Sequence, residues 1–355
     1  MSALLLQPLV IRGVTLRNRI LVSPMCQYSS DDGFANDWHL VHLGARAVGG
    51  AAAVLTEAAA VTADGRISAA DLGIYKDAHV DMLSRIFRFV EQQGAVPGMQ
   101  LSHAGRKAST AEPWKGSRPV DPANGGWTPI WGPSAESFRE GWQTPREMSL
   151  ADIRAVVEAF GTAAQRLLAA GGRIAEIHAA HGYLLHEFLS PLSNHRTDAY
   201  GGTFDNRIRV VLETVDCVRA VWPQELPLFV RISATDWVDG GWTAEDSVAL
   251  AKRLKDHGVD LVDCSTGGNV AQAKIPLGPG YQVPYAERVR REACILTGAV
   301  GLITEASQAE EILQRGQADA IIVARQFLRD PYFALHAAQA LGETPPVPVQ
   351  YQRAF

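Results

Sequence analysis

This 355-residue chain lacks several sequence features that are typical of other protein classes. The four cysteines form no CxxC pair, which argues against zinc and iron–sulfur sites. Acidic residues outnumber basic ones and give a net charge of −5, which argues against a nucleic-acid partner. No apolar run approaches the ~20 residues that cross a bilayer. These absences indicate a globular protein with free thiols, which we expect in the cytoplasm and without a membrane partner.

Three sequence motifs are also absent. No GxGxxG follows the first predicted strand, which argues against a Rossmann dinucleotide fold. HExxH is missing, because His186-Glu187 is followed by FLS, and we predict no metal site. The opening MSALLLQPLVIRG has no basic stretch before its apolar run, and Gln7 and Pro8 interrupt that run. We therefore expect no signal peptide.

Short apolar runs alternate with amphipathic segments along the whole chain. The runs that we predict as strands are 20–25, 51–58, 95–102, 174–180, 226–234, 261–266, 294–300 and 320–327. Helical patterns separate most of them, for example at 77–93, 151–170, 205–220, 245–257 and 305–315. Apolar strands separated by helices indicate a parallel sheet. Eight such units favour an α/β fold with a single (β/α)8 TIM barrel and extended βα loops at its C-terminal mouth.

We assign the barrel to residues 1–340 and a C-terminal tail to residues 341–355. Two connections, 103–148 and 181–204, are too long to be simple turns, and both follow predicted strands. Long ordered loops at the mouth of a barrel usually build lids and active sites. We predict a lid for 103–148, with a purely structural excursion as the alternative, and an active-site loop for 181–204. The Pro-rich tail is either disordered or docked on a neighbouring subunit.

Polar side chains gather where the predicted strands end. His178, His181 and Tyr183 fall within six residues after the fourth strand. Such a trio could polarise a carbonyl oxygen and protonate a neighbouring carbon, although a structural histidine pair stays open. Arg231 lies at the end of the fifth strand and is costly to bury without an anionic partner. A bound anion, an electron-rich cofactor or a pairing with Glu176 would satisfy it.

Four other strand ends carry candidate binding residues. The first strand ends in the unusual cluster Ser23-Pro24-Met25-Cys26, although a lone cysteine is more often an ordinary buried thiol. Gln100 lies near the end of the third strand. The last two strands end near Gly301 and near Ala324-Arg325, where barrels commonly bind phosphate through backbone N–H groups. The alternative for Gly301 is that it only shapes a turn.

Taken together, these segments resemble the old yellow enzyme family. The matching stretches follow the family's order from residue 8 to about 333: PLVIRGVTLRNRILVSPMCQYS, DGRISAADLGIY, QLSHAGRK, EIHAAHGYLLHEFLSPLSNHRTDAYGGTFDNRIR, LFVRISATDW, VDLVDCSTG and ADAIIVARQFLRDP. SPMCQYS and the ending QYQRAF are similar to a bacterial branch with a cysteine beside the flavin. That branch usually ends in Arg-Gly-Trp, whereas this chain ends in Arg-Ala-Phe. The Trp-rich segment 108–146 is also longer than in some relatives.

The resemblance implies non-covalent FMN in the barrel mouth. The positions that match contacts to its ring are Ser23, Pro24, Met25, Cys26, Ala58, Gln100 and Arg231, and those that match the phosphate site are Gly301, Ala324 and Arg325. His178 and His181 match the pair that binds the oxygen of a small-molecule substrate, Tyr183 matches the proton donor, and Tyr28 matches a hydrogen bond to the substrate. Cys26 matches a thiol that tunes the flavin potential. Arg353 matches a tail residue that reaches a neighbouring subunit's site, which implies a homodimer or homotetramer.

The implied activity is that of an ene-reductase: NADPH reduces FMN, which then reduces activated C=C bonds of α,β-unsaturated carbonyl or nitro compounds. Reduction of xenobiotic nitro-esters or quinones on the same scaffold is an alternative. A Schiff-base aldolase would need a lysine at a strand end, and Lys107 is the nearest candidate. The complete histidine–tyrosine trio disfavours a non-catalytic flavoprotein.

Overall fold

The eight strands predicted from the apolar runs form one closed parallel barrel. The computed structural model describes residues 3–354. Its barrel strands are β3 (Ile20–Val22), β4 (Ala53–Ala60), β5 (Val96–Ser102), β8 (Ile174–Ala179), β9 (Leu228–Ser233), β10 (Leu261–Ser265), β11 (Leu296–Ala299) and β12 (Ala320–Val323). The barrel closes where β12 pairs with β3, with Ile321 opposite Ile20. The predicted TIM barrel is therefore confirmed.

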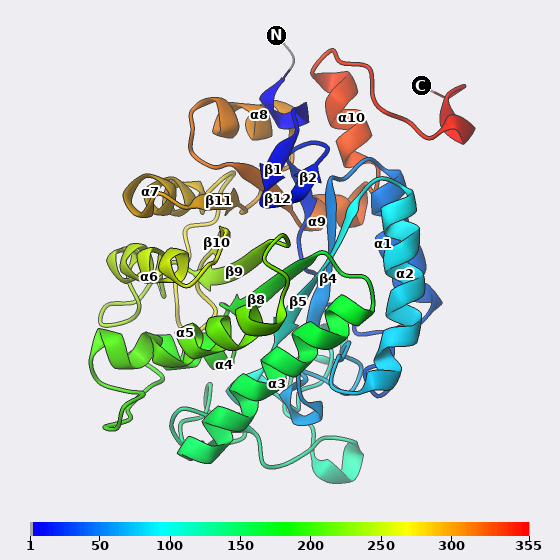
Figure 1. The fold of residues 1–355 in the computed structure, drawn as a ribbon. Coiled ribbons are helices and arrows are strands. Elements are labelled where there is room, and N and C mark those ends of the chain that lie inside the picture. Colours follow the sequence, from blue (N-terminus) through cyan, green and yellow to red (C-terminus); the bar gives the residue numbers. More distant parts are fainter. Residues whose placement is uncertain (1–2, 355) are drawn as a thin grey trace.

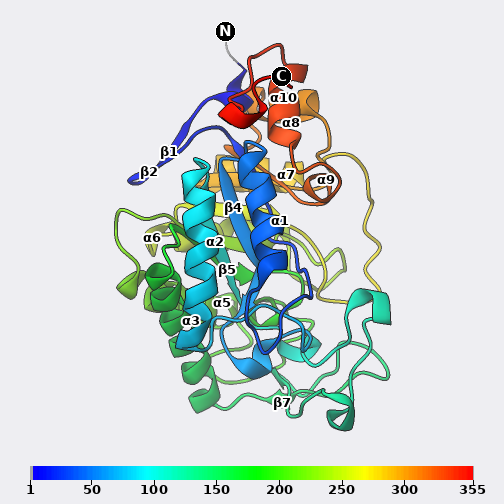
Figure 2. The same cartoon turned by 90° about the vertical axis from the view of Figure 1, so that its right-hand side faces the viewer.

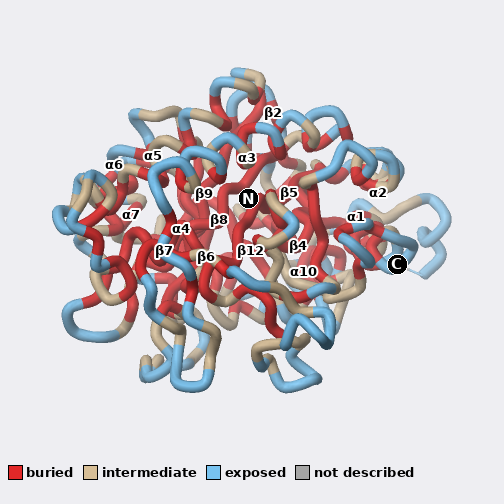
Figure 3. The backbone as a smooth tube through the Cα atoms, turned by 90° about the horizontal axis from the view of Figure 1, so that it is seen from below, coloured by how far each residue is buried: buried red, intermediate tan, exposed pale blue. Residues whose placement is uncertain are grey.

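Helices surround the barrel (Figures 1 and 2). They are α1 (Asp37–Val48), α2 (Val80–Gln92), α3 (Leu150–Ala169), α5 (Phe204–Val221), α6 (Ala244–Asp256), α7 (Val283–Ala293), α8 (Ala306–Gln314) and α10 (Phe333–Ala340), with the short α4 (Leu184–Leu189) and α9 (Arg325–Arg329). Several begin at side-chain caps: Ser149 and Thr243 each accept a backbone N–H from the first turn of α3 and α6. The helices cover strands that are buried on both faces, and the buried backbone lies at the centre in Figure 3.

Two predicted strands were too long. The first ends at Val22 rather than at residue 25, and Pro24, which has no N–H to donate to a ladder, follows that end. The run 320–327 is a strand only to Val323, and α9 begins at Arg325. A short apolar run does not distinguish a strand from the buried helix that follows it. Both corrections place the residues after the strand in the loops of the mouth.

The two ends of the barrel differ in construction. A hairpin of β1 (Leu9–Ile11) and β2 (Val14–Leu16), which the apolar pattern did not predict, lies with both chain ends at the top of Figure 1. The excursion 103–148, with the short strands β6 (Trp131–Gly132) and β7 (Arg146–Glu147), lies at the opposite end. Among residues 3–354, no helix combines the length and apolarity that a membrane crossing requires.

Indole groups attach the excursion to the barrel. The N–H groups of Trp127 and Trp131 both donate to Asp64, the first to its backbone oxygen at 3.0 Å and the second to its carboxylate at 2.6 Å. Glu187 of α4 accepts the backbone N–H of Arg106 at 2.8 Å. The excursion is therefore an ordered wall beside the mouth.

Candidate active site

The rings of His178, His181 and Tyr183 meet at the end of β8. The centroids of the two imidazoles lie 5.1 Å apart, and the Tyr183 ring lies 5.1 Å from that of His178. His178 is the penultimate residue of β8, whereas Tyr183 immediately precedes α4. The structure thus brings together the three side chains that the sequence placed within six residues.

The two imidazoles are neutral. Nδ1 of His178 accepts the backbone N–H of Ala180 at 3.2 Å, so its proton is on Nε2. Burial, followed by the charge of Arg231, holds the pKa of His178 and of His181 well below the usual histidine value. His178 therefore presents a fixed N–H, which is a hydrogen-bond donor that needs no proton from solvent.

Two serines contact His181, and the register of the barrel strands brings them together. Its Nε2 lies 2.7 Å from the hydroxyl of Ser265, and its backbone N–H donates to Ser233 at 2.9 Å. This contact was not predicted from the sequence. β9 and β10 pair with Ser233 opposite Ser265, which brings one hydroxyl to the backbone N–H of His181 and the other to its ring.

Tyr183 and Tyr28 are both protonated phenols. Burial raises the pKa of Tyr183 well above its usual value, and it also raises that of Tyr28. Trp114 of the excursion lies edge-on to Tyr28, with ring centroids 5.7 Å apart. The excursion therefore contacts a residue that the resemblance assigns to the substrate side.

Cys26 lies beside Tyr28 and Ala58. Burial raises the pKa of its thiol, and the nearby Asp71 and Glu57 raise it further, against hydrogen bonds with Ala58 and Tyr28. The side chain is thus a neutral thiol at ordinary pH. All four cysteines are free.

Arg231 has an acidic partner, but a different one from that weighed in the sequence. Its Nε lies 3.0 Å from the carboxylate of Asp263, which stands directly opposite on β10. Glu176 instead accepts a hydrogen bond from Gln100 at 2.7 Å. Burial raises the pKa of Glu176, and Asp263 raises it further while Arg231 lowers it. The predicted alternative of a pairing between Arg231 and Glu176 was therefore wrong, because the partner is Asp263. The sequence did not reveal this partner, because Asp263 lies within an apolar run.

An arginine-lined pocket lies between the ends of β11 and β12. It brings together Gly301, Ala324 and Arg325, as the resemblance implied, with Arg231 and Arg329 also in its wall. Gly301 has φ +110°, and a Cβ there would lie 3.0 Å from the amide of Gln282. The guanidinium groups of Arg325 and Arg329, beside a glycine whose φ disfavours a side chain, suit a dianionic phosphate. The residues present therefore fit FMN.

One expected contributor, Arg353, is exposed. The tail that carries it lies at the end of the barrel opposite the excursion (Figures 1 and 2). The tail is near α10 in this chain, where the hydroxyls of Tyr351 and Tyr332 are 3.3 Å apart. Arg353 therefore does not line its own chain's mouth.

A parallel barrel with a phosphate-type pocket beside neutral hydrogen-bond donors defines a class: flavin-dependent barrel oxidoreductases. Residues 4–343 match the NADH:flavin oxidoreductase / NADH oxidase family. The chain is 51% identical to the NADPH dehydrogenase of Geobacillus sp. (strain WCH70), over 100% of this chain and 99% of that protein. It is 47% identical to the NADPH dehydrogenase of Bacillus subtilis (strain 168), over the full length of both.

Solved structures show the same fold. The old yellow enzyme homologue from Zymomonas mobilis aligns with a TM-score of 0.78 at 24% identity, over 98% of this chain and 95% of that one. Morphinone reductase aligns with a TM-score of 0.80 at 24% identity, over 97% and 91%. This chain belongs to the NADH:flavin oxidoreductase / NADH oxidase family and shares its fold with the old yellow enzyme homologue. It is an FMN-dependent oxidoreductase that uses a nicotinamide nucleotide as co-substrate.

Proposed function

We propose that this enzyme is an NADPH-dependent ene-reductase that acts on alkenes conjugated to a carbonyl or nitro group. The observation that carries the proposal is the meeting of two neutral imidazoles and a protonated phenol, with ring centroids 5.1 Å apart, beside the arginine-lined pocket. FMN held at the mouth by Arg231, Gly301 and Arg325 would supply hydride transfer from NADPH to the β-carbon of the alkene. NADPH is preferred to NADH by analogy with the dehydrogenases from Geobacillus and Bacillus.

The residues around the substrate complete the addition. His178 and His181 donate hydrogen bonds to its carbonyl or nitro oxygen, which withdraws charge from the double bond as a hydride arrives. Tyr183 gives its phenolic proton to the α-carbon, and solvent returns a proton to the phenolate. The π bond is thereby replaced by two C–H bonds, one formed from a hydride and one from a proton. Tyr28 donates to the substrate from the side of the excursion.

The remaining roles concern the cofactor. Arg231 would stabilise negative charge on the reduced flavin, and Gln100 would donate a hydrogen bond to its ring. Ser23, Pro24, Met25 and Ala58 contact the ring, while Gly301, Ala324 and Arg325 hold the phosphate. Cys26 tunes the flavin potential through a neutral thiol.

The tail completes the site of a neighbouring subunit. Arg353 is exposed and lies away from its own mouth, which supports a homodimer or homotetramer in which residues 341–355 dock on the partner. We place the enzyme in the cytoplasm, where its four free thiols would stay reduced.

An absorbance spectrum of the purified protein tests the function. The account predicts a yellow protein that NADPH bleaches and that 2-cyclohexenone then restores in the absence of oxygen. A protein that takes up no FMN, or whose reduced form 2-cyclohexenone does not reoxidise, would refute the proposal.

A further inference from the structure

The peptide bond between His181 and Gly182 is held at both of its polar atoms. Its oxygen accepts a hydrogen bond from Nζ of Lys107, and its N–H donates to Nδ1 of His186, each at 2.8 Å. His181 has φ +60°, in the left-handed region, which costs a residue with a side chain about 1–2 kcal/mol. Such a backbone persists only where its surroundings hold it.

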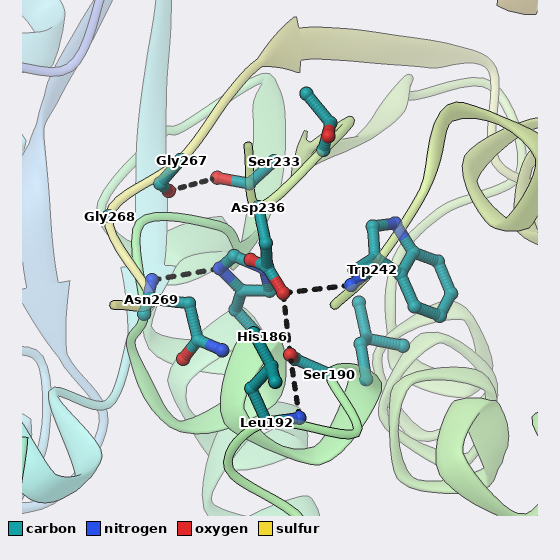
Figure 4. A network of polar contacts seen from close by, with 12 residues as sticks. His186, Ser190, Leu192, Ser233, Asp236, Trp242, Gly267, Gly268 and Asn269 are labelled. Carbon is teal, nitrogen blue, oxygen red and sulfur yellow. Dashed lines mark hydrogen bonds and ion pairs between the residues drawn. The ribbon is translucent and has the colours of Figure 1, made fainter. Parts of the chain in front are cut away.

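A buried acid fixes the proton of His186. Because Nδ1 accepts from Gly182, the ring's proton is on Nε2, which lies 3.0 Å from the carboxylate of Asp236. The other oxygen of Asp236 accepts from the hydroxyl of Ser190 at 2.5 Å and from the backbone N–H of Trp242 at 2.9 Å (Figure 4). His186 and Asp236 are both fully buried. Their contacts therefore allow one tautomer of the imidazole.

Asp236 remains ionised in this network. Burial raises its pKa, but His186, Ser190 and the N–H of Trp242 together lower the pKa below the usual value. The carboxylate therefore stands behind the N–H of Gly182, with one imidazole between them.

Lys107 holds the opposite side of the same peptide. Its ammonium also donates to the backbone oxygen of Gly268 and lies 4.2 Å from the ring centroid of Phe138 in the excursion. A Cβ on Gly182 would lie 2.3 Å from the oxygen of Gly268, so the two loops are in close contact. The lysine thereby joins the excursion, the loop after β8 and the loop after β10.

The groups on the two sides favour one orientation of the peptide. Burial lowers the pKa of Lys107 to about 7, and its amine donates to the peptide oxygen in either protonation state. An ionised acid lies behind the N–H. Rotation of the peptide would turn its N–H toward Lys107 and its oxygen toward the lone pair of His186. Both contacts would then become repulsive.

We propose that Lys107 and the His186–Asp236 pair are positioning residues that hold this peptide and thereby aim His181 and Tyr183 at the substrate. None of the three acts on the flavin in this scheme. The inference rests on the proposed function, because it assumes that His181 and Tyr183 serve the alkene step.

Substitution of Asp236 by Asn tests the proposal through the tautomer. The new amide must direct its NH2 group either at the N–H of Trp242 or at His186. The second arrangement moves the imidazole proton to Nδ1, where it faces the N–H of Gly182. We expect reoxidation of the reduced enzyme by 2-cyclohexenone to slow about tenfold or more, which corresponds to about 1.4 kcal/mol of barrier. FMN affinity and the rate of FMN reduction by NADPH should change much less.

Ser190→Ala is the matched control. It also removes a hydrogen bond from Asp236, but it leaves the carboxylate and the tautomer of His186 intact. Reoxidation should therefore slow far less than in Asp236→Asn. Equal slowing in the two variants, or equal slowing of both half-reactions in Asp236→Asn, would overturn the proposal.

Variants of His186 supply a rescue test. Glutamine carries an acceptor and a donor on one planar group, whereas leucine carries neither. His186→Gln should retain much of the reoxidation rate that His186→Leu loses, with melting temperature and FMN affinity measured alongside. If His186→Leu does not fold, the comparison of Asp236→Asn with Ser190→Ala still decides the matter.

Tyr183→Phe separates failure of this inference from failure of the proposed function. If that substitution leaves reoxidation unchanged, both ideas are overturned. If it slows reoxidation while Asp236→Asn does not exceed Ser190→Ala, only the positioning role is overturned.

Discussion

The two halves of the barrel mouth are held in place by different means. Around His181, buried side chains such as Lys107, His186 and Ser265 hold the backbone and the ring. Around the anion pocket, backbone conformation at Gly301 makes the space and arginines supply the charge. The comparison teaches that a substitution in the first half should change the chemical step, whereas one in the second half should change cofactor affinity.

Among substitutions that should affect only one half of the mouth, Gly301→Ala is expected to have the largest effect. A side chain at φ +110° is strained, and its Cβ would lie 3.0 Å from Gln282. A strain of about 1–3 kcal/mol would weaken FMN binding roughly 5- to 150-fold as the backbone relaxes away from the phosphate. FMN titration of the apoprotein measures this.

Gly171→Ala is the control for that substitution. Gly171 also has a positive φ, +89°, but a Cβ there would have no neighbour within 4 Å, and it follows α3 at the other end of the barrel. It should leave FMN affinity unchanged. Equal weakening in both variants would show that backbone strain in general, rather than the pocket, controls binding.

Truncation of the tail tests whether a neighbouring subunit contributes to the barrel mouth. Removal of residues from Tyr351 onward deletes Arg353, which we assign to the partner's site. The KM for an enone should rise roughly 5- to 30-fold, as the loss of 1–2 kcal/mol gives, with FMN affinity unchanged. Steady-state kinetics and sedimentation velocity measure both consequences. Tyr332→Phe removes only the hydroxyl contact to Tyr351 and serves as the control; unchanged kinetics and assembly in the truncated enzyme would refute the tail's role.

The smallest expected effect is that of a substitution at Cys26, which belongs to neither half of the mouth. Cys26→Ser replaces a neutral thiol beside the ring with a stronger hydrogen-bond donor. A difference of about 1 kcal/mol between the two redox states would move the midpoint potential by roughly 20 mV, with FMN still bound. Redox titration that shows no shift would remove the proposed role of Cys26.

Much of the fold was predictable because each strand is a separate apolar run. The barrel strands are buried on both faces, so eight short runs and the helices between them indicated the architecture. Boundaries at Val22 and Val323 were wrong because single apolar residues, Met25 and Phe327, follow the strands and extended the predicted runs. The β1–β2 hairpin was missed because its strands have only three residues each.

The site was predictable only where its residues are close in sequence. His178, His181 and Tyr183 belong to one short segment, and the strand that precedes them places them at the mouth. Asp263 and Ser265 meet the site through the register of β9 and β10, which no local pattern encodes. His186 and Asp236 are 50 positions apart in the numbering and meet only in the folded barrel.

The proposed function requires His178 and His181 to act as a pair of neutral hydrogen-bond donors in the alkene step. Stopped-flow measurement of the two half-reactions in a His178→Ala, His181→Ala double variant tests this most directly. Loss of one donor of this kind costs about 2.7–4 kcal/mol of barrier, or roughly 100- to 1000-fold in rate. Reoxidation by 2-cyclohexenone should therefore slow by at least that factor while FMN reduction by NADPH slows far less. Equal slowing of both half-reactions would contradict the account.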